Sequence, residues 1–150
     1  KAKFWYKNGN IDAEEEYTEG KLNGKSTTWF EDGKRRESEC INGVLNGKEI
    51  SWFKNGNKEC ECEYKEGKRN GKGFWWFENG NKDAEIEYKD ELKNGKWIEW
   101  NDKGVKIKDA EYKEGIRNGR FIVWDNEGKK IYEQEWRDGE MIKDYLALEK

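Results

Sequence analysis

Hydrophobic and polar residues alternate along most of this chain, and the alternating segments return at a nearly constant spacing. A tryptophan stands four residues before a glycine in each segment, at Trp5, Trp29, Trp52, Trp76, Trp100 and Trp124. A second, mostly aromatic column consists of Tyr17, Cys40, Tyr64, Tyr88, Tyr112 and Trp136. Self-similarity at a fixed period indicates a repeat protein. The pattern therefore predicts six tandem units of about 24 residues.

Each unit is predicted to form a β-hairpin. In the fourth unit, residues 72–77 alternate as a first strand and residues 84–88 as the return strand. Asn79-Gly80 between them predicts a two-residue turn in which both residues have positive φ. Residues 89–95 are expected to form a longer turn into the next unit. Glu91 stands where other units have glycine, which predicts a different turn there because positive φ is costly for other residues.

Strand alternation sorts the side chains of each hairpin onto two faces. In the fourth unit, Ile86 and Tyr88 share one face of the return strand, and Glu85 and Glu87 share the other. Acidic residues fill the same two positions in every unit: Glu14, Glu16, Glu37, Glu39, Glu61, Glu63, Glu85, Glu87, Asp109, Glu111, Glu133 and Glu135. A basic column consists of Lys1, Lys25, Lys48, Lys72, Lys96 and Arg120. We expect a solvated face on which some carboxylates pair with lysines across strands.

The fold class that follows is all-β, an elongated, twisted antiparallel sheet. About twelve short strands are expected, in six tandem hairpins over residues 1–140. Residues 141–150 break the period and form the rest of the chain. Ile142, Tyr145 and Leu146 fit a helical spacing, and Asp144 can cap the start of a helix. The tail is therefore predicted to be a short helical cap over the last hairpin, as terminal repeats need.

Composition sharpens the prediction of the core. Only 33 % of the residues are hydrophobic and 42 % are charged, yet aromatic residues reach 15 %. A chain this poor in aliphatic residues has little to bury except its aromatic side chains, each of which covers a large area. The tryptophan and tyrosine columns are therefore predicted to form the core. A tryptophan ladder that stacks against sugars or peptides is the alternative.

The same composition excludes several classes of function. The chain contains no histidine, which rules out Ser-His-Asp triads, Cys-His pairs and histidine-ligated metals. A net charge of −3 argues against nucleic acid as a partner, and no apolar run is long enough to span a membrane. Cys60 and Cys62 share a strand face near Cys40, where small buried fillers are favoured over a three-cysteine metal site. We predict no catalytic residue, metal site or cofactor.

One set of residues is a candidate binding surface. Aromatic residues also occupy the face opposite the tryptophan column, and the acidic columns are expected to run beside them. The residues of this candidate set are Phe30, Phe53, Trp75, Phe77, Trp97, Glu63 and Glu87. Because exposed apolar patches mark interaction sites, the stripe is predicted to bind a basic or amphipathic segment of a protein partner. The alternative is a satellite core or an oligomer contact, and the oligomeric state stays open.

Two stretches of the chain carry a family resemblance. Residues 52–58 read WFKNGNK, and residues 63–72 read EYKEGKRNGK. They resemble the MORN repeat, and more closely its bacterial variant, and the resemblance extends over residues 2–140. The resemblance implies an elongated, twisted sheet of successive hairpins that binds a partner without carrying out chemistry. Departures from the pattern are Cys40, Glu91, Asn101 and Asp125.

The family suggests more than one biological role. Some bacterial members are labelled YwqK-type toxin–antitoxin antitoxins, and others are linked to the cell envelope. The resemblance therefore implies a non-enzymatic binding or scaffold module of a bacterium, with an antitoxin-like role as one instance. A secreted or envelope-associated, adhesin-like module that binds glycans or a host protein is the alternative. The expected location is the cytoplasm or, after removal of a signal, the envelope or the exterior.

Overall fold

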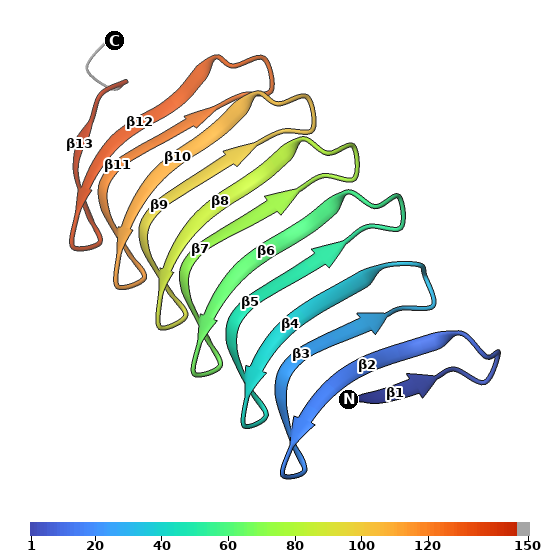
Figure 1. The fold of residues 1–150 in the computed structure, drawn as a ribbon. Helices are drawn as coiled ribbons and strands as arrows, with labels where there is room; N and C mark the ends of the chain where they lie inside the picture. The colour runs from blue at the N-terminus through green and yellow to red at the C-terminus, as the bar shows by residue number, and fades with distance from the viewer. Residues whose placement is uncertain (147–150) are drawn as a thin grey trace.

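The computed structural model describes residues 1–146 and shows one sheet of thirteen antiparallel strands (Figure 1). The strands are β1 (Ala2–Trp5), β2 (Ile11–Thr18), β3 (Lys21–Trp29), β4 (Arg35–Ile41), β5 (Val44–Trp52), β6 (Lys58–Lys65), β7 (Lys68–Trp76), β8 (Lys82–Lys89), β9 (Leu92–Trp100), β10 (Lys106–Lys113), β11 (Ile116–Trp124), β12 (Lys130–Arg137) and β13 (Glu140–Asp144). They pair in chain order, so every connection is a hairpin. The all-β, antiparallel class predicted from the alternation is confirmed.

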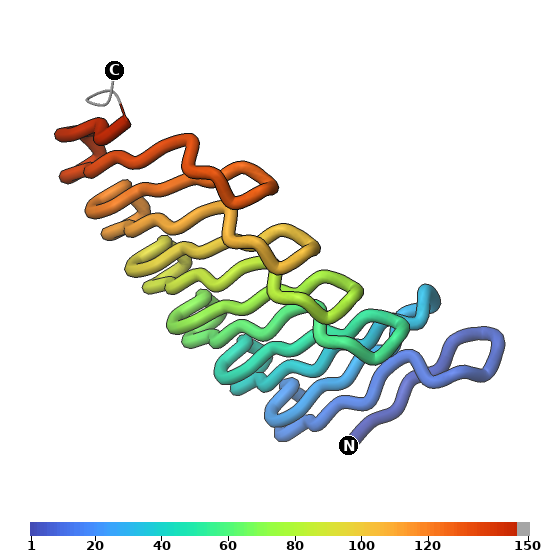
Figure 2. Tube along the Cα trace, turned by 90° about the horizontal axis from the view of Figure 1, so that it is seen from above, coloured from blue at the N-terminus to red at the C-terminus, as the bar shows by residue number. Residues whose placement is uncertain are grey.

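The strands lie side by side along one long axis, with β1 at one end and β13 at the other (Figures 1 and 2). Each strand is bent along its length (Figure 1). The main contacts of a strand are with the strands just before and after it. The architecture is therefore that of a solenoid-like repeat protein, in which each part packs chiefly on its neighbours.

Two-residue turns join the even-numbered strands to the strands that follow them. Glu66 and Gly67 form one such turn, with φ of 51° and 78°. Two successive positive φ values define the type I′ turn, whose twist matches that of the flanking strands. Asp90 and Glu91 make the same turn, with φ of 50° and 72°, so the different turn predicted at Glu91 is wrong. The Glu91 carboxylate accepts hydrogen bonds from the Arg69 amide and from Arg69 Nε, which offsets the strain at this position.

Longer loops join the odd-numbered strands to the strands that follow them. In the loop after β7, Gly80 N donates to Phe77 O at 2.9 Å, and Phe77 N donates to Asn81 O at 2.9 Å. Gly80 has a φ of 88°, whereas Asn79 is not among the residues with positive φ. This geometry is a type I turn followed by a glycine bulge. The two-residue turn predicted for Asn79-Gly80 is therefore wrong, and Phe77 lies in the loop rather than in the strand.

The second Asn-Gly pair of each unit lies inside a strand. Gly95 belongs to β9 and has a φ of 120°, so residues 89–95 are not one long turn as predicted. Tyr88 pairs with Lys93 while Ile86 pairs with Trp97, which leaves extra residues on β9 as a bulge. Equivalent glycines, with φ from 115° to 125°, are Gly24, Gly47, Gly71 and Gly119. These bulges interrupt the pairing at the same position in each odd-numbered strand from β3 to β11.

The sheet has two faces that differ in their aromatic residues. The Tyr face carries Tyr88, which meets Trp75 edge to face at 6.3 Å between ring centroids. The Trp face carries Trp76, whose ring lies 6.0 Å from that of Phe74. Since Trp75 and Tyr88 come from opposite ends of their strand pair, their contact indicates that the sheet bends toward the Tyr face.

The core lies on the Tyr face and consists of small and medium-sized residues. Its buried hydrophobic residues are Ala13, Cys40, Cys62, Ala84, Ile86, Tyr88 and Ala110. None of the six residues of the tryptophan column is buried, and Trp5 is 59 % exposed. The prediction that both aromatic columns form the core is therefore wrong for the tryptophans. They lie on the opposite face from the tyrosines, and no second layer of the described chain covers them.

The tail adds a strand and not a helix. Residues 140–144 form β13, in which Met141 pairs with Trp136 of β12. Tyr145 N then donates to Glu133 O at 2.8 Å. Pairing with the open edge of β12 satisfies backbone groups that a helix there would leave without partners. The predicted helical cap is thus wrong over residues 141–146, and its last part, residues 147–150, lies outside the described residues.

Candidate functional site

The Trp face is covered by a lattice of opposite charges. Glu61 forms ion pairs with Lys48 at 2.9 Å and with Lys58 at 2.6 Å. The hydrogen bonds from these lysines lower the pKa of the Glu61 carboxyl, and that from Lys58 has the larger effect. Lys82 pairs with Glu85 at 3.2 Å and also lies over a ring of the tryptophan column. Because these charges compensate one another, the face carries little net charge to attract a partner.

Glu133 is the most buried carboxylate of this lattice. It is 6 % exposed and forms ion pairs with Arg120 and Lys130. Hydrogen bonds from Lys130 and Arg120 hold the pKa of the Glu133 carboxyl below its usual value. A buried carboxylate needs such partners because an unpaired charge is costly to bury. Glu133 is therefore tied into the fold more closely than a carboxylate on a solvated face would be.

The Tyr face carries a cluster of aromatic side chains over β7 to β12. Trp75 and Trp97 pack against the buried cluster formed by Ala84, Ile86 and Tyr88. Trp97 also lies 5.6 Å from Tyr112 between ring centroids. The indole nitrogens of Trp97 and Trp136 are buried without a hydrogen-bond partner among the described residues. No other element of residues 1–146 covers this cluster, because all strands belong to the one sheet.

Four basic side chains lie on the aromatic rings of this face, and we call them the cationic row: Arg69, Lys93, Lys108 and Arg117. Arg69 lies 4.4 Å from the Tyr88 ring centroid. Lys93 and Lys108 lie 3.0 and 3.4 Å from the centroid of Trp97. Arg117 lies over two further rings, at 4.3 and 4.7 Å. Such stacking holds each charged group against a ring.

The lysines of the cationic row are partly desolvated. Burial is the main cause that lowers the pKa of the Lys93 ammonium, and the nearby charge of Lys108 lowers it further. Burial likewise lowers the pKa of Lys108, with a contribution from Arg117 in the same direction, while Glu99 opposes both. These directions indicate that like charges have been brought together on this part of the sheet.

Sequence reasoning missed the cationic row, although a signal for it exists. The residue five positions after the tyrosine column changes from leucine to basic residues along the chain: Leu22, Leu45, Arg69, Lys93 and Arg117. The type I′ turn places this residue opposite the tyrosine column, as in the pairs Tyr64↔Arg69 and Tyr88↔Lys93. Aligning the units by this turn shows that basic residues replace leucine at this position from Arg69 onward.

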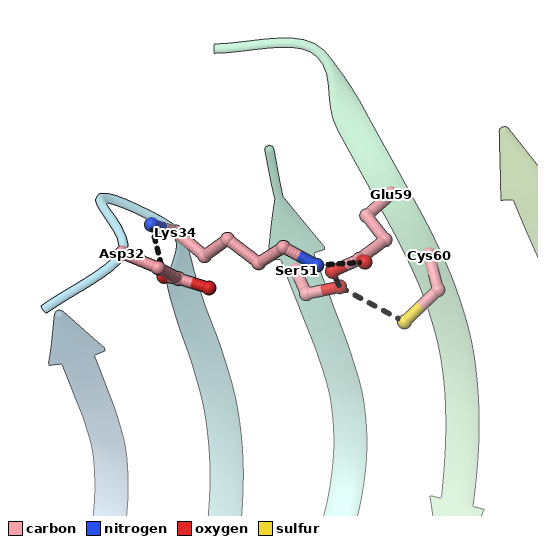
Figure 3. Close-up of polar contacts among 5 residues, drawn as sticks. All are labelled: Asp32, Lys34, Ser51, Glu59 and Cys60. Carbon is pink, nitrogen blue, oxygen red and sulfur yellow. Dashed lines mark hydrogen bonds and ion pairs between the residues drawn. The ribbon is translucent and has the colours of Figure 1, made fainter. Parts of the chain in front are cut away.

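A hollow with a volume of about 310 Å³ lies in the first half of the array, and its lining includes Phe30, Ser51 and Glu59. Figure 3 shows the Lys34 side chain reaching past β5 to Glu59, where Nζ meets Oε1 at 2.6 Å. Ser51 Oγ donates to Glu59 Oε2 at 3.1 Å and lies 3.2 Å from Cys60 Sγ. The Phe30 ring lines this hollow beneath Arg36, and Lys34 Nζ also lies 5.3 Å from the centroid of the Phe53 ring. Lys34 and Glu59 form an ion pair within this hollow.

The three cysteines are free thiols in different surroundings. Cys40 and Cys62 are buried, as expected of small fillers, whereas Cys60 is half-buried beside Ser51. Hydrogen bonds from Cys62 and Ser51 lower the pKa of Cys60 to about 6, while the pKa of Cys62 is raised. Within residues 1–146, no group of three or more acidic or cysteine side chains is gathered as for a metal ion.

Alkylation tests this difference between the thiols. Because the thiolate is the reactive form, Cys60 is expected to react with iodoacetamide at neutral pH well before Cys40 and Cys62. The Ser51→Ala variant removes the Ser51 Oγ–Cys60 Sγ contact and should slow the reaction. Peptide mass spectrometry of timed samples measures the order. Earlier modification of either buried thiol, or a Cys60 rate that rises only near the ordinary pKa of 9.0, would contradict the expectation.

The structure separates the residues of the predicted candidate surface. Trp75 and Trp97 lie together on the Tyr face, as the contacts above show. Phe30, Phe53 and Phe77 lie in the loops that follow β3, β5 and β7. Glu87 belongs to the Trp face, since it pairs with Lys72 there, and Glu63 occupies the equivalent position on β6. Acidic columns therefore do not border the aromatic cluster, which is bordered by cations instead.

The geometry defines a class of protein, an open single-sheet array of β-hairpins with two uncovered faces over the described residues. Comparison with family models adds a match: three segments, residues 1–19, 45–66 and 69–90, match the model described as MORN repeat variant. No curated protein matches the chain. The match suggests a repeat-based binding or scaffold module. Within residues 1–146, no helix is long and apolar enough to cross a membrane.

Proposed function

We propose that this protein is a non-enzymatic protein-binding module that receives its partner on the Tyr face. The observation that carries the proposal is the aromatic cluster over β7 to β12. Trp75, Trp97 and Tyr112 are only half-buried, yet ring contacts fix their positions: Trp75 packs on Tyr88, and Trp97 packs on Tyr112. Aromatic residues with a small ordering cost are the ones that supply binding energy at interfaces.

The distribution of polar groups supports binding rather than catalysis. Carboxylates and lysines recur at the same positions of successive strands and satisfy one another, as Glu61 and Glu85 do. Catalysis needs a single place where groups of different kinds converge. In this proposal the chain is an array of six hairpin units, and its regular backbone holds the aromatic cluster rigid. The antitoxin-like and adhesin-like roles stay predictions.

Two adjacent aromatic residues on opposite faces provide the test. Photo-crosslinking variants Trp75→benzoylphenylalanine and Phe74→benzoylphenylalanine differ by one position but point to the Tyr face and the Trp face respectively. Each variant is irradiated in a lysate of the organism that carries the gene, and adducts are identified by mass spectrometry. We expect reproducible protein adducts from the Trp75 variant and few from the Phe74 variant. Equal labelling by both variants, or none, would overturn the proposal.

A further inference from the structure

The charge on the Tyr face differs from that of the molecule as a whole. The chain has a net charge of −3, yet Lys93, Lys108 and Arg117 lie close together on this face. Glu99 is 3.7 Å from Lys108, whereas no carboxylate of residues 1–146 lies within ion-pair distance of Lys93 or Arg117. Arg69, at the end of the cationic row, is paired with Glu91 at 2.9 Å. Lys93, Lys108 and Arg117 together therefore carry an excess of positive charge.

The rings hold these charges in fixed places. Lys93 and Lys108 lie over Trp97, and Arg117 lies over Phe121 and Trp136. The ring faces are consequently occupied by the protein's own cations and are not free to stack on flat groups such as bases. What remains available above the rings is positive charge with N–H donors. This arrangement suits carboxylates better than it suits single-stranded nucleic acid, whose bases stack on open aromatic faces.

The spacing of the row limits the shape of its ligand. Arg69, Lys93 and Arg117 stand at the same position on β7, β9 and β11. Strands in a sheet lie about 4.8 Å apart, so residues on alternate strands are about 10 Å apart. A polyproline II segment advances about 9 Å for every three residues. A segment of this kind that crosses the strands would bring every third side chain to one cation.

From charge, stacking and spacing together, we propose that the cationic row binds an acidic, extended segment of a protein partner. Carboxylates three residues apart on the segment meet Lys93 and Arg117, and the segment lies along the array, across the strands. This inference rests on the proposed function and names the chemical class of its partner. It reverses the charge expected from the sequence, because the acidic columns that predicted a basic partner lie on the Trp face.

Fluorescence anisotropy tests the proposal with defined probes. The first probe is a labelled peptide with glutamate at every third position and proline between, and the second replaces each glutamate by lysine. We expect the acidic peptide alone to bind, with an affinity that falls as salt rises. The double variant Lys93→Glu/Arg117→Glu should weaken its binding about tenfold or more, equivalent to about 1.4 kcal/mol. Binding of the basic peptide alone, or of neither peptide, would overturn the inference.

Matched variants keep the test specific. Lys89→Glu/Lys113→Glu places the same charge change on exposed residues of the Trp face, and it should leave acidic-peptide binding within about twofold of wild type. The double variant Lys93→Gln/Arg117→Gln removes the two positive charges without adding repulsion. Circular dichroism of each variant checks that it is folded. Equal losses in the Trp-face variant would mean that the charge of the whole molecule, and not the cationic row, controls peptide binding, which contradicts the inference.

Three further outcomes distinguish a failure of this inference from a failure of the proposed function. A labelled oligothymidine that binds more tightly than the acidic peptide, and is lost in the same Lys93/Arg117 variant, would assign the row to nucleic acid and overturn the inference. Absence of acidic-peptide binding together with face-selective crosslinking at Trp75 would reject the acidic class of partner and leave the proposed function standing. Absence of face-selective crosslinking rejects the proposed function itself.

Discussion

Replacing Gly95 by alanine is expected to destabilise the fold by about 3 kcal/mol, because the backbone there has a conformation that only glycine adopts readily. Gly95 has a φ of 120°, far from the left-handed helical region near +57°. A Cβ at this position would also overlap the Glu87 side chain, including its Cβ and carboxyl carbon. Urea unfolding followed by tryptophan fluorescence measures the loss.

Two comparisons distinguish the causes of this loss. Gly104 has a φ of 81° and open space around a built Cβ, so Gly104→Ala should cost only about 1 kcal/mol, the cost of an ordinary residue at positive φ. Glu87→Ala combined with Gly95→Ala removes the overlap with the Glu87 carboxyl group but leaves the close contact with its Cβ and the backbone strain. We expect the double variant to recover only part of the loss. A Gly95→Ala variant as stable as Gly104→Ala would contradict the role given to the bulge.

The bulge also shows why the sequence predicted the strands but misplaced the turns. Asn79-Gly80 and Asn94-Gly95 are the same dipeptide, and each is a strong local signal for a turn. In the structure the first lies in a loop and the second inside β9, while the actual two-residue turn is Asp90-Glu91. Strand pairing decides between these uses, and pairing depends on residues of the neighbouring strand that no dipeptide contains.

Register likewise explains which part of the candidate site was predictable. Alternation placed Trp75 and Phe74 on opposite faces correctly. The sequence did not show whether Trp75 or Trp76 shares a face with the tyrosine of the return strand. That choice depends on a bulge, because Trp75 pairs with Ala84 whereas Trp76 pairs with Lys82. The expected neighbourhood of aromatic and acidic columns failed for this reason. The open sheet, with no second layer over residues 1–146, leaves Trp5 exposed and the other five residues of the tryptophan column half-buried.

Replacing Tyr88 by alanine is expected to cost about 3–5 kcal/mol, the range for removing a large side chain from a core. Tyr88 is 9 % exposed, meets Trp75 at 6.3 Å and supports Arg69 on its ring. Tyr17 occupies the same column at the end of the array but is 44 % exposed. Tyr17→Ala should therefore cost about 1 kcal/mol or less. Urea unfolding of both variants measures the difference, and similar losses would contradict the assignment of the core.

The position of Tyr88 in the array determines where the loss appears. Each strand packs chiefly on its neighbours, so a cavity in β8 weakens the link between the two halves of the sheet and leaves distant strands intact. Hydrogen exchange of the Tyr88→Ala variant should rise first in β7 to β9, while β2 to β4 keep their protection. Because β7 to β9 also carry Lys93 and Trp97, this variant should weaken acidic-peptide binding as well. A uniform rise over all thirteen strands would show that the sheet unfolds as one unit, with no separate weakening at its centre.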